Sequence, residues 1–528
     1  MFNKIRTITG KHLGVILLLL IVFSALVIRI VAIANAGDYW FDERATLIIT
    51  DNPIGEVWRY ALLDVHPPLY YLLIHLWGSV FGFSAFVVRL FSVIFGSVTV
   101  IIVYFLGRDI FNKQVGLIGA LLFAVSPYAI DYSSEARMYG IGFFLSATST
   151  YLLWKLCVGT RHKNFVIISY LFTVTLSLYT HIFFIISALG QILFLIIKRK
   201  TVNNFKTIFI VLFLSFLVFS PWIISFMQSR IYEVKENSIG DGWFFQEPSA
   251  IPAIIQIFPK LLSDSRNQVV YYIWYIVSAV LFFVGITLRK ADEGVLSNEQ
   301  KPDGALLMAC IIISSVILSI FITVPVERYY FYIAPFYCLI VARGINRMVS
   351  ANISATIKGV VVFFIVTLLL FSRTNSNYSA WNKISEYIVN AANTQGATIL
   401  QPHTLIMKNY YPSEYKNFIT VGPASHLSDE KEWILRHNWK WYSSSVTNYE
   451  EENMLFEKQI SAQLSIDYNY VFYPMQSFSL RGKMIKKILE KNGYHCCGVT
   501  YFPSKRDSIS VLTMGKFCVV DDRRCAAY

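Results

Sequence analysis

The chain is dominated by long apolar segments that are separated by shorter polar ones. A helix that crosses a membrane needs about 20 consecutive apolar residues, and segments that meet or approach this length recur up to residue 372. The pattern predicts eleven spanning helices, at residues 13–34, 84–107, 115–131, 140–157, 165–180, 183–197, 207–227, 269–288, 305–324, 329–345 and 352–372.

The first apolar segment and the basic residues around the others orient these helices. The run at 13–34 is longer than a cleavable signal sequence needs, so we predict that it is retained. With a cytoplasmic N-terminus, most basic loop residues fall on the cytoplasmic side, and the opposite short loops carry only Arg137 and Arg328. The loops 35–83 and 228–268, and everything after residue 373, then lie outside the cytoplasm. We predict an integral protein of the bacterial inner (plasma) membrane.

Composition agrees with this interpretation. Hydrophobic residues make up 55% of the 528 residues and charged residues only 15%, whereas soluble proteins carry about a quarter charged residues. The net charge of +13 would suit nucleic acid, but many of the lysines and arginines lie between apolar segments, where they orient helices. We therefore expect the lipid bilayer as a partner and no nucleic acid.

The pattern changes after residue 373. Short β-rich stretches at 397–401, 468–473, 498–502 and 508–514 alternate with amphipathic candidates at 450–464 and 480–491. This alternation predicts a soluble extracytoplasmic α/β domain at 374–528, beside a transmembrane domain at 1–373.

Four cysteines lie near the end of the chain: Cys496, Cys497, Cys518 and Cys525. Outside the cytoplasm such thiols can be oxidised, so we expect at least one disulfide bond among the four. A bond between the two adjacent cysteines would be strained. The sequence does not fix the connectivity.

Two adjacent carboxylates, Asp42 and Glu43, follow the first predicted span. A carboxylate at a membrane surface suits an enzyme that must deprotonate a hydroxyl acceptor. The alternative is an ordinary solvated loop. Two adjacent carboxylates taken by themselves favour this alternative over a catalytic site.

Other polar residues also lie at the predicted outer ends of helices. Arg137 offers a planar fork for phosphate oxygens and Glu135 can orient it, although a salt bridge at a helix end is the common alternative. His181 and Arg328 mark further outer turns, with an interfacial histidine and an ion pair as their ordinary interpretations. Arg89 is a stronger indication of a binding site, because an arginine buried in a bilayer usually has a partner or a ligand.

These polar groups are predicted to converge on one face of the membrane. A channel would instead place charges along the middle of its helices, and a transporter or flippase for lipid-linked sugars would show repeated halves and polar residues in mid-membrane. The helix centres are nearly free of acids and bases, and the sequence shows no internal repeat. An enzyme is the favoured function, with the flippase as the alternative.

The motifs together resemble a known superfamily. The pair Asp42-Glu43, followed by the run at 64–69 (Asp-Val-His-Pro-Pro-Leu), resembles the protein O-mannosyltransferases of the GT-C superfamily. The runs at 89–96, 134–139 and 179–181 are similar to bacterial family-39 glycosyltransferases of the same superfamily. The resemblance covers roughly residues 10–370, in order.

Two departures leave the acceptor open. The loop at 228–268 stands where eukaryotic protein mannosyltransferases carry a large lumenal domain, and Val65-His66 stands where the aminoarabinose transferases that modify lipid A have Glu-Lys. Neither a protein acceptor nor lipid A is therefore specifically indicated, and a glycan, a lipid or a protein remains open.

The resemblance implies a GT-C fold, a sugar donor linked to polyprenyl phosphate, and inverting transfer by direct displacement on the extracytoplasmic side. It implies that Asp42 is the catalytic base, with Glu43 beside it, and that Arg137 holds the donor phosphate. The remaining expected substrate-binding residues are His66, Arg89, Glu135, His181 and Arg328. The residues point to no certain cofactor, because Arg137 and Arg328 can neutralise the leaving phosphate without metal, and a divalent cation that bridges Asp42 and the phosphate is an open alternative.

Overall fold

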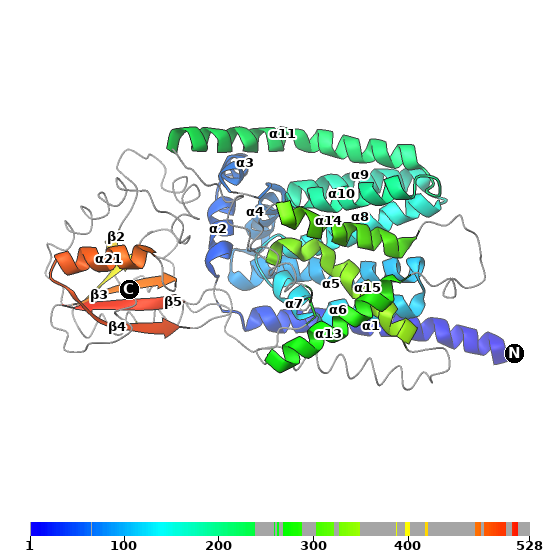
Figure 1. The fold of residues 1–528 in the computed structure, drawn as a ribbon, viewed down its shortest axis with the longest axis horizontal. Coiled ribbons are helices and arrows are strands. Elements are labelled where there is room, and N and C mark those ends of the chain that lie inside the picture. Colours follow the sequence, from blue (N-terminus) through cyan, green and yellow to red (C-terminus); the bar gives the residue numbers. More distant parts are fainter. Residues whose placement is uncertain are drawn as a thin grey trace. The chain divides into compact units, whose positions relative to one another are not determined.

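The computed structural model shows helices over most of the chain and strands near its end (Figure 1). It describes residues 2–37, 39–64, 66–237, 258, 261–262, 268–287, 303–321, 327–348, 387, 397–401, 418–420, 470–476, 480–502 and 509–515. The chain divides into two compact units, one of Met1–Ala34 with Val65–Asn375 and the other of Asn35–Asp64 with Ser376–Tyr528.

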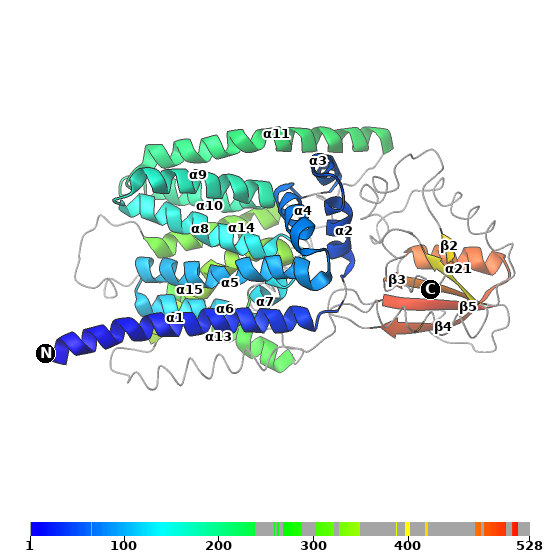
Figure 2. The ribbon, with the colours of Figure 1, turned by 180° about the vertical axis from the view of Figure 1, so that it is seen from behind.

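The first unit is a bundle of apolar helices. Its helices are α1 (Phe2–Ala34), α4 (Leu69–Phe81), α5 (Ala85–Ile110), α6 (Lys113–Val125), α7 (Pro127–Ser133), α8 (Tyr139–Val158), α9 (Lys163–Thr180), α10 (Phe184–Ile197), α11 (Phe205–Asn237), α13 (Gln268–Ile286), α14 (Gly304–Phe321), the 3₁₀ helix η2 (Glu327–Ile333) and α15 (Ala334–Met348). Helices α1, α5 and α6 pack against one another, as can be followed from behind in Figure 2.

Large apolar side chains remain exposed on this bundle. Leu19, Phe172 and Phe213 are each more than 60% exposed, which suits contact with lipid rather than with water. In the described part of the chain, α1, α5, α8 and α11 contain segments long and apolar enough to cross a membrane, and α6 with α7 supplies one more if the bent pair is a single span. The expected polytopic helical membrane protein is confirmed.

The predicted spans before residue 350 each coincide with described helices, with one correction. The segment predicted as one span at 115–131 is two helices, α6 and α7, bent by 59°. Pro127 starts α7, and the Ser126 hydroxyl accepts a hydrogen bond from the Ala129 backbone amide at 3.2 Å. Proline has no amide hydrogen to continue α6, and serine caps the new helix, so the chain bends there. The predicted span at 352–372 lies outside the described residues.

The second unit combines helices with a mixed sheet. Helices α2 (Phe41–Thr50) and α3 (Ile54–Leu63) come from the predicted first outer loop. Five strands, β1 (Ala397–Gln401), β2 (Phe418–Thr420), β3 (Tyr470–Gln476), β4 (His495–Phe502) and β5 (Ile509–Gly515), lie in the order β2-β1-β3-β5-β4. Strand β1 is parallel to β2 and β3, whereas β5 is antiparallel to β3 and β4.

Helix α21 (Leu480–Lys491) completes the described part of this second unit. Its Leu489 is buried, as are Val471, Val499 and Met514 of the sheet. Strands β1, β3, β4 and β5 and helix α21 coincide with predicted stretches, so the expected α/β composition is confirmed. The predicted helix at 450–464 and the predicted boundary at residue 373 lie outside the described residues.

The cysteines differ between the two units. Cys496 and Cys497 are disulfide-bonded, as expected for part of the predicted cysteine set, while Cys518 and Cys525 lie outside the described residues. In the helical bundle, Cys157, Cys310 and Cys338 are free and buried.

Candidate functional site

Two histidines from distant parts of the sequence meet in the helical bundle. His66 lies in the loop before α4, where Pro67 and Pro68 delay the start of the helix, and His181 directly follows α9. Their ring centroids are 4.8 Å apart, and the residues are only 3% and 0% exposed. We call these two residues the histidine pair.

Aromatic rings enclose the histidine pair. Tyr329 of η2 lies 6.1 Å from His66 and 5.4 Å from His181, measured between ring centroids. Phe183 stacks on Tyr329 at 5.2 Å, and Phe331 packs edge-on against His181 at 5.2 Å. The rings exclude water and lower the local polarity, which strengthens any electrostatic interaction made there.

Two arginines bring positive charge to the histidine pair. Burial lowers the pKa of His66 well below its usual value, and the charges of Arg137 and Arg328 lower it further. Burial likewise lowers the pKa of His181, with added contributions from His66, Arg137 and Arg328. Both imidazoles are therefore neutral at physiological pH, in a region where two guanidinium groups supply the positive charge.

The hydrogen bonds of the histidine pair leave two ring nitrogens for other partners. The Phe183 backbone amide donates to Nδ1 of His181 at 3.2 Å, so the neutral ring carries its hydrogen on Nε2. Among the described residues, neither Nε2 of His181 nor Nδ1 of His66 has a hydrogen-bond partner. Buried polar atoms are normally hydrogen-bonded, so these two atoms indicate a place for a ligand or water.

The loop between α7 and α8 carries Glu135 and Arg137, which are 0% and 4% exposed. The Ser92 hydroxyl of α5 donates to the Arg137 carbonyl oxygen at 3.1 Å. A Cβ atom at Gly140 would lie 2.4 Å from the Ser92 carbonyl oxygen, so only glycine lets α8 begin this close to α5. Arg89, also buried, lies one turn before Ser92 on the same helix.

The structure therefore brings together four of the predicted substrate-binding residues: His66, Arg137, His181 and Arg328. Glu135 shares the loop of Arg137, and Arg89 lies on the helix that holds this loop. The sequence prediction missed Tyr329 as part of the site. Its position directly after Arg328, at a predicted outer helix end, was the available signal.

The two predicted catalytic carboxylates lie at the start of α2, in the second unit. The Trp40 backbone amide donates to Glu43 Oε2 at 3.1 Å, and Glu43 is fully buried. This bond caps the helix N-terminus, so Glu43 has a structural task. Asp42 is half-buried in the same turn, and its backbone carbonyl accepts a hydrogen bond from the Thr46 hydroxyl.

No group of three or more metal-ligating side chains occurs in the described ranges.

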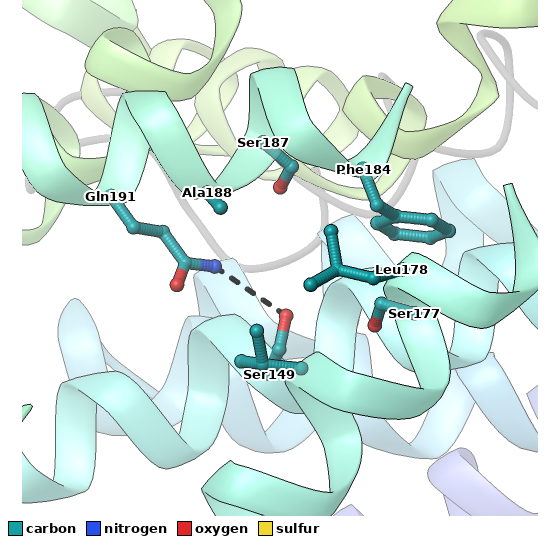
Figure 3. A pocket seen from close by; sticks show the side chains of 8 residues that line it. Ser149, Ser177, Leu178, Phe184, Ser187, Ala188 and Gln191 are labelled. Atoms are coloured by element: carbon teal, nitrogen blue, oxygen red, sulfur yellow. Dashed lines mark hydrogen bonds between the residues drawn. The ribbon is translucent and has the colours of Figure 1, made fainter. Parts of the chain in front are cut away.

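A second buried polar cluster lies between α8, α9 and α10. Ser149, Ser177, Ser187 and Gln191 contribute polar groups to the lining of a small cavity (Figure 3). The Tyr170 hydroxyl donates to Gln191 Oε1 at 2.6 Å, and Gln191 Nε2 donates to Ser149 Oγ at 3.4 Å. We call Tyr170, Gln191 and Ser149 the amide cluster; none of the three carries a charge.

Comparisons with known proteins agree with this architecture. Residues 65–224, which include the histidine pair and Arg137, match a family described as dolichyl-phosphate-mannose-protein mannosyltransferase. The chain is similar to the apo crystal structure of ArnT from Cupriavidus metallidurans, with a TM-score of 0.54, 11% identity, and coverage of 94% of this chain and 97% of that one. This likeness shows that the chain has the GT-C fold.

Two further structures share this GT-C fold. ArnT from Cupriavidus metallidurans bound to undecaprenyl phosphate matches with a TM-score of 0.50 and 10% identity, over 94% of this chain and 97% of that one. The archaeal oligosaccharyltransferase AglB from Archaeoglobus fulgidus, in complex with an inhibitory peptide and a dolichol-phosphate, matches with a TM-score of 0.53 and 12% identity, over 95% and 74%. No curated protein sequence matches the chain. The expected GT-C fold is confirmed, and the closer resemblance to bacterial family 39 stays a prediction.

Proposed function

We propose that this GT-C protein is an inverting glycosyltransferase that moves a sugar from a polyprenyl-phosphate donor to a hydroxyl acceptor. The observation that carries the proposal is the joining of two arginines with two neutral, buried histidines at loops between helices. Such a group of cations and N–H donors fits the single phosphate of a lipid-linked sugar. Related GT-C structures hold undecaprenyl phosphate and a dolichol-phosphate, which supports the same donor class here.

The proposed role of the two arginines and the histidine pair is to stabilise the leaving group. As the bond between the anomeric carbon and the phosphate oxygen breaks, negative charge grows on the phosphate. Arg137 and Arg328 neutralise this charge, and the Nε2 hydrogen of His181 donates to a phosphate oxygen. Preorganised donors in a buried site stabilise such a transition state without waiting for solvent to reorganise.

Asp42 is the proposed base. Its carboxylate takes the proton of the acceptor hydroxyl while the hydroxyl oxygen forms the new bond to the anomeric carbon, and the electron pair of the broken bond leaves with polyprenyl phosphate. The attack comes from the face opposite the leaving group, so the anomeric configuration inverts. Glu43 holds the N-terminus of α2 through its bond to Trp40. A divalent cation between Asp42 and the phosphate is the alternative, and a chelator series tests it.

The proposed location is the bacterial inner (plasma) membrane, with a cytoplasmic N-terminus and the site on the extracytoplasmic side. The asymmetric distribution of lysine and arginine supports it. Reporter fusions after residues 113, 163, 200 and 290 should report the cytoplasm, and fusions after residues 240 and 400 should report the outside. A fusion after residue 200 that reports the outside would contradict the proposed orientation.

The function is tested with purified protein in lipid vesicles and a panel of labelled polyprenyl-phosphate sugars, with a membrane extract as the source of acceptors. We expect the sugar to be transferred and free polyprenyl phosphate to be released. Arg161→Ala, which changes an exposed arginine in the loop before α9, is the control and should transfer like the wild type. Movement of the intact donor across the vesicle membrane, without release of phosphate, would instead favour the flippase alternative.

A further inference from the structure

A buried arginine in α1 has no role in the function proposed above. Arg29 is fully buried within the first predicted span, an exception to the expectation that the helix centres hold few charges. A charged side chain in this setting is costly, and its presence usually reflects a specific partner or function. Its contacts show what it does.

The guanidinium group of Arg29 binds the end of α6. It donates to the Ala124 carbonyl oxygen through Nη1 at 2.9 Å and to the Phe123 carbonyl oxygen through Nη2 at 3.5 Å. In a continuous helix, the Phe123 carbonyl would accept from the residue four positions later, which is Pro127 and has no amide hydrogen. Arg29 therefore satisfies acceptors that the break in the helix leaves open.

The same guanidinium group also binds α7, on the other side of the bend. Its Nε donates to the Ser133 hydroxyl at 2.7 Å, and this hydroxyl donates to the Ala129 carbonyl oxygen at 2.5 Å. A Cβ atom at Gly96 of α5 would lie 2.3 Å from the Ser133 Cβ and 3.5 Å from Arg29 Nε. The bond is thus held between three helices, with no space for the bend to relax toward α5.

Ser133 is the last residue of α7, two positions before Glu135 and four before Arg137. The orientation of α7 determines where the loop at 134–138 begins, and Ser92 fixes the loop again at Arg137. We propose that Arg29 is a positioning residue: by locking the 59° bend between α6 and α7 it holds the Glu135–Arg137 loop in place for the lipid-linked phosphate. This inference rests on the proposed function.

The alternative is that Arg29 stabilises the bundle and has no influence on the loop. Ser133→Ala separates the two explanations, because it removes the bond to α7 and leaves the bonds from Arg29 to Phe123 and Ala124 intact. Ser215→Ala is the matched control, since the Ser215 hydroxyl is also buried and, within the described ranges, bonds to the Val211 carbonyl of its own helix alone. Arg29→Gln is the stronger variant, and Ser133→Ala keeps the test open if Arg29→Gln does not fold.

Two readouts are compared on full-length protein in detergent. Hydrogen exchange should become faster in residues 134–138 of Ser133→Ala, with exchange in the middle of α8 unchanged. The Kd for undecaprenyl phosphate should rise about three- to tenfold, as expected for one lost hydrogen bond, while Ser215→Ala should change neither quantity. In an Arg137→Ala background, Ser133→Ala should add little to the loss of affinity, because the two changes act through the same side chain.

Unchanged loop exchange in Ser133→Ala would overturn the inference, as would an unchanged Kd combined with a lower melting temperature. If the wild-type protein does not bind undecaprenyl phosphate at all, the proposed donor class fails. The exchange measurement still decides in that case whether Arg29 positions the loop, so the two failures are distinguishable.

Discussion

The histidine pair and the amide cluster are both buried in the helical bundle, yet they differ in how completely their polar groups are satisfied. In the amide cluster, the oxygen of the Gln191 amide accepts from Tyr170 and its nitrogen donates to Ser149. In the histidine pair, one nitrogen of each ring has no hydrogen-bond partner among the described residues. A satisfied polar network specifies and stabilises packing, whereas open polar atoms near charges indicate a place for a ligand.

The surroundings of the two clusters follow the same division. The amide cluster belongs to α8, α9 and α10, where neutral groups can satisfy one another at modest cost. The histidine pair belongs to loops at helix ends, and Arg137 and Arg328 lower the pKa of His66 and His181. Two guanidinium groups beside two neutral imidazoles suit the binding of an anion such as phosphate. We therefore assign a folding role to the amide cluster and a binding role to the histidine pair.

The largest expected effect concerns the proton transfer from the acceptor hydroxyl, which involves neither cluster. Asp42→Asn should lower the turnover of sugar transfer about a hundredfold or more, because the acceptor hydroxyl loses its base. Binding of undecaprenyl phosphate should not change. Glu43→Gln is the matched control: it should lower the melting temperature, because Glu43 caps α2, and should reduce turnover less. Full turnover of purified Asp42→Asn would remove Asp42 as the base.

The next effect concerns binding at the histidine pair. Arg137→Ala removes a charge-assisted contact worth about 1.5–3 kcal/mol, so the Kd for undecaprenyl phosphate should rise by roughly 10- to 150-fold. Arg137→Lys keeps the charge without the planar fork and should fall between the wild type and Arg137→Ala. Titration of the purified variants with undecaprenyl phosphate measures this. Equal affinity of Arg137→Ala and the wild type would show that the phosphate binds elsewhere.

The amide cluster should respond in the opposite way. Gln191→Leu leaves the buried Tyr170 hydroxyl without its acceptor, which should cost about 1–3 kcal/mol of stability, seen as a lower melting temperature in detergent. The Kd for undecaprenyl phosphate should stay at the wild-type value. Adding Tyr170→Phe removes the stranded hydroxyl and should restore part of the stability. A large change in donor affinity, with normal stability, would break the distinction between the two clusters.

Much of this architecture could be predicted from the sequence, because its main signals are local. Twenty-residue apolar runs specify spanning helices without knowledge of their neighbours. The run Pro67-Pro68 and the polar turn before Tyr139 marked helix ends, which is where His66 and Arg137 lie. Strands β1, β3, β4 and β5 were predictable for the same reason, since a pattern within a few residues identifies them, whereas the three-residue strand β2 (Phe418–Thr420) was missed.

The features that sequence reasoning missed depend on contacts between distant segments. The segment at 115–131 is mostly apolar, which predicted a single span, although Ser126-Pro127 is a local signal for the 59° bend found there. The partners of Arg29 on α6 and α7 could not be assigned, because these acceptors are 94, 95 and 104 positions away in the sequence. The helix-capping role of Glu43 could not be predicted, because a capping carboxylate and a catalytic carboxylate have the same local sequence pattern.

The last expected effect is a dependence of stability on pH that, of the two clusters, belongs to the histidine pair alone. The folded protein has lowered pKa values at His66 and His181, so it holds both rings neutral, while the unfolded chain takes up protons below about pH 6.5. Stability is therefore complete above pH 6.5 and falls as the pH drops below it. The slope should reach up to about 1.4 kcal/mol per pH unit for each histidine.

Melting temperatures between pH 7.5 and 5 measure this dependence. His66→Gln/His181→Gln should flatten the curve, whereas Gln191→Leu should lower it without changing its slope, and His162→Gln, at an exposed position, should leave it unaltered. Saturating undecaprenyl phosphate should reduce the acid loss of the wild type, because a bound anion favours the protonated imidazoles. A ligand-bound protein that loses stability on acidification as steeply as the free protein would mean that the phosphate does not reach the histidine pair, and the contrast with the amide cluster would then need another cause.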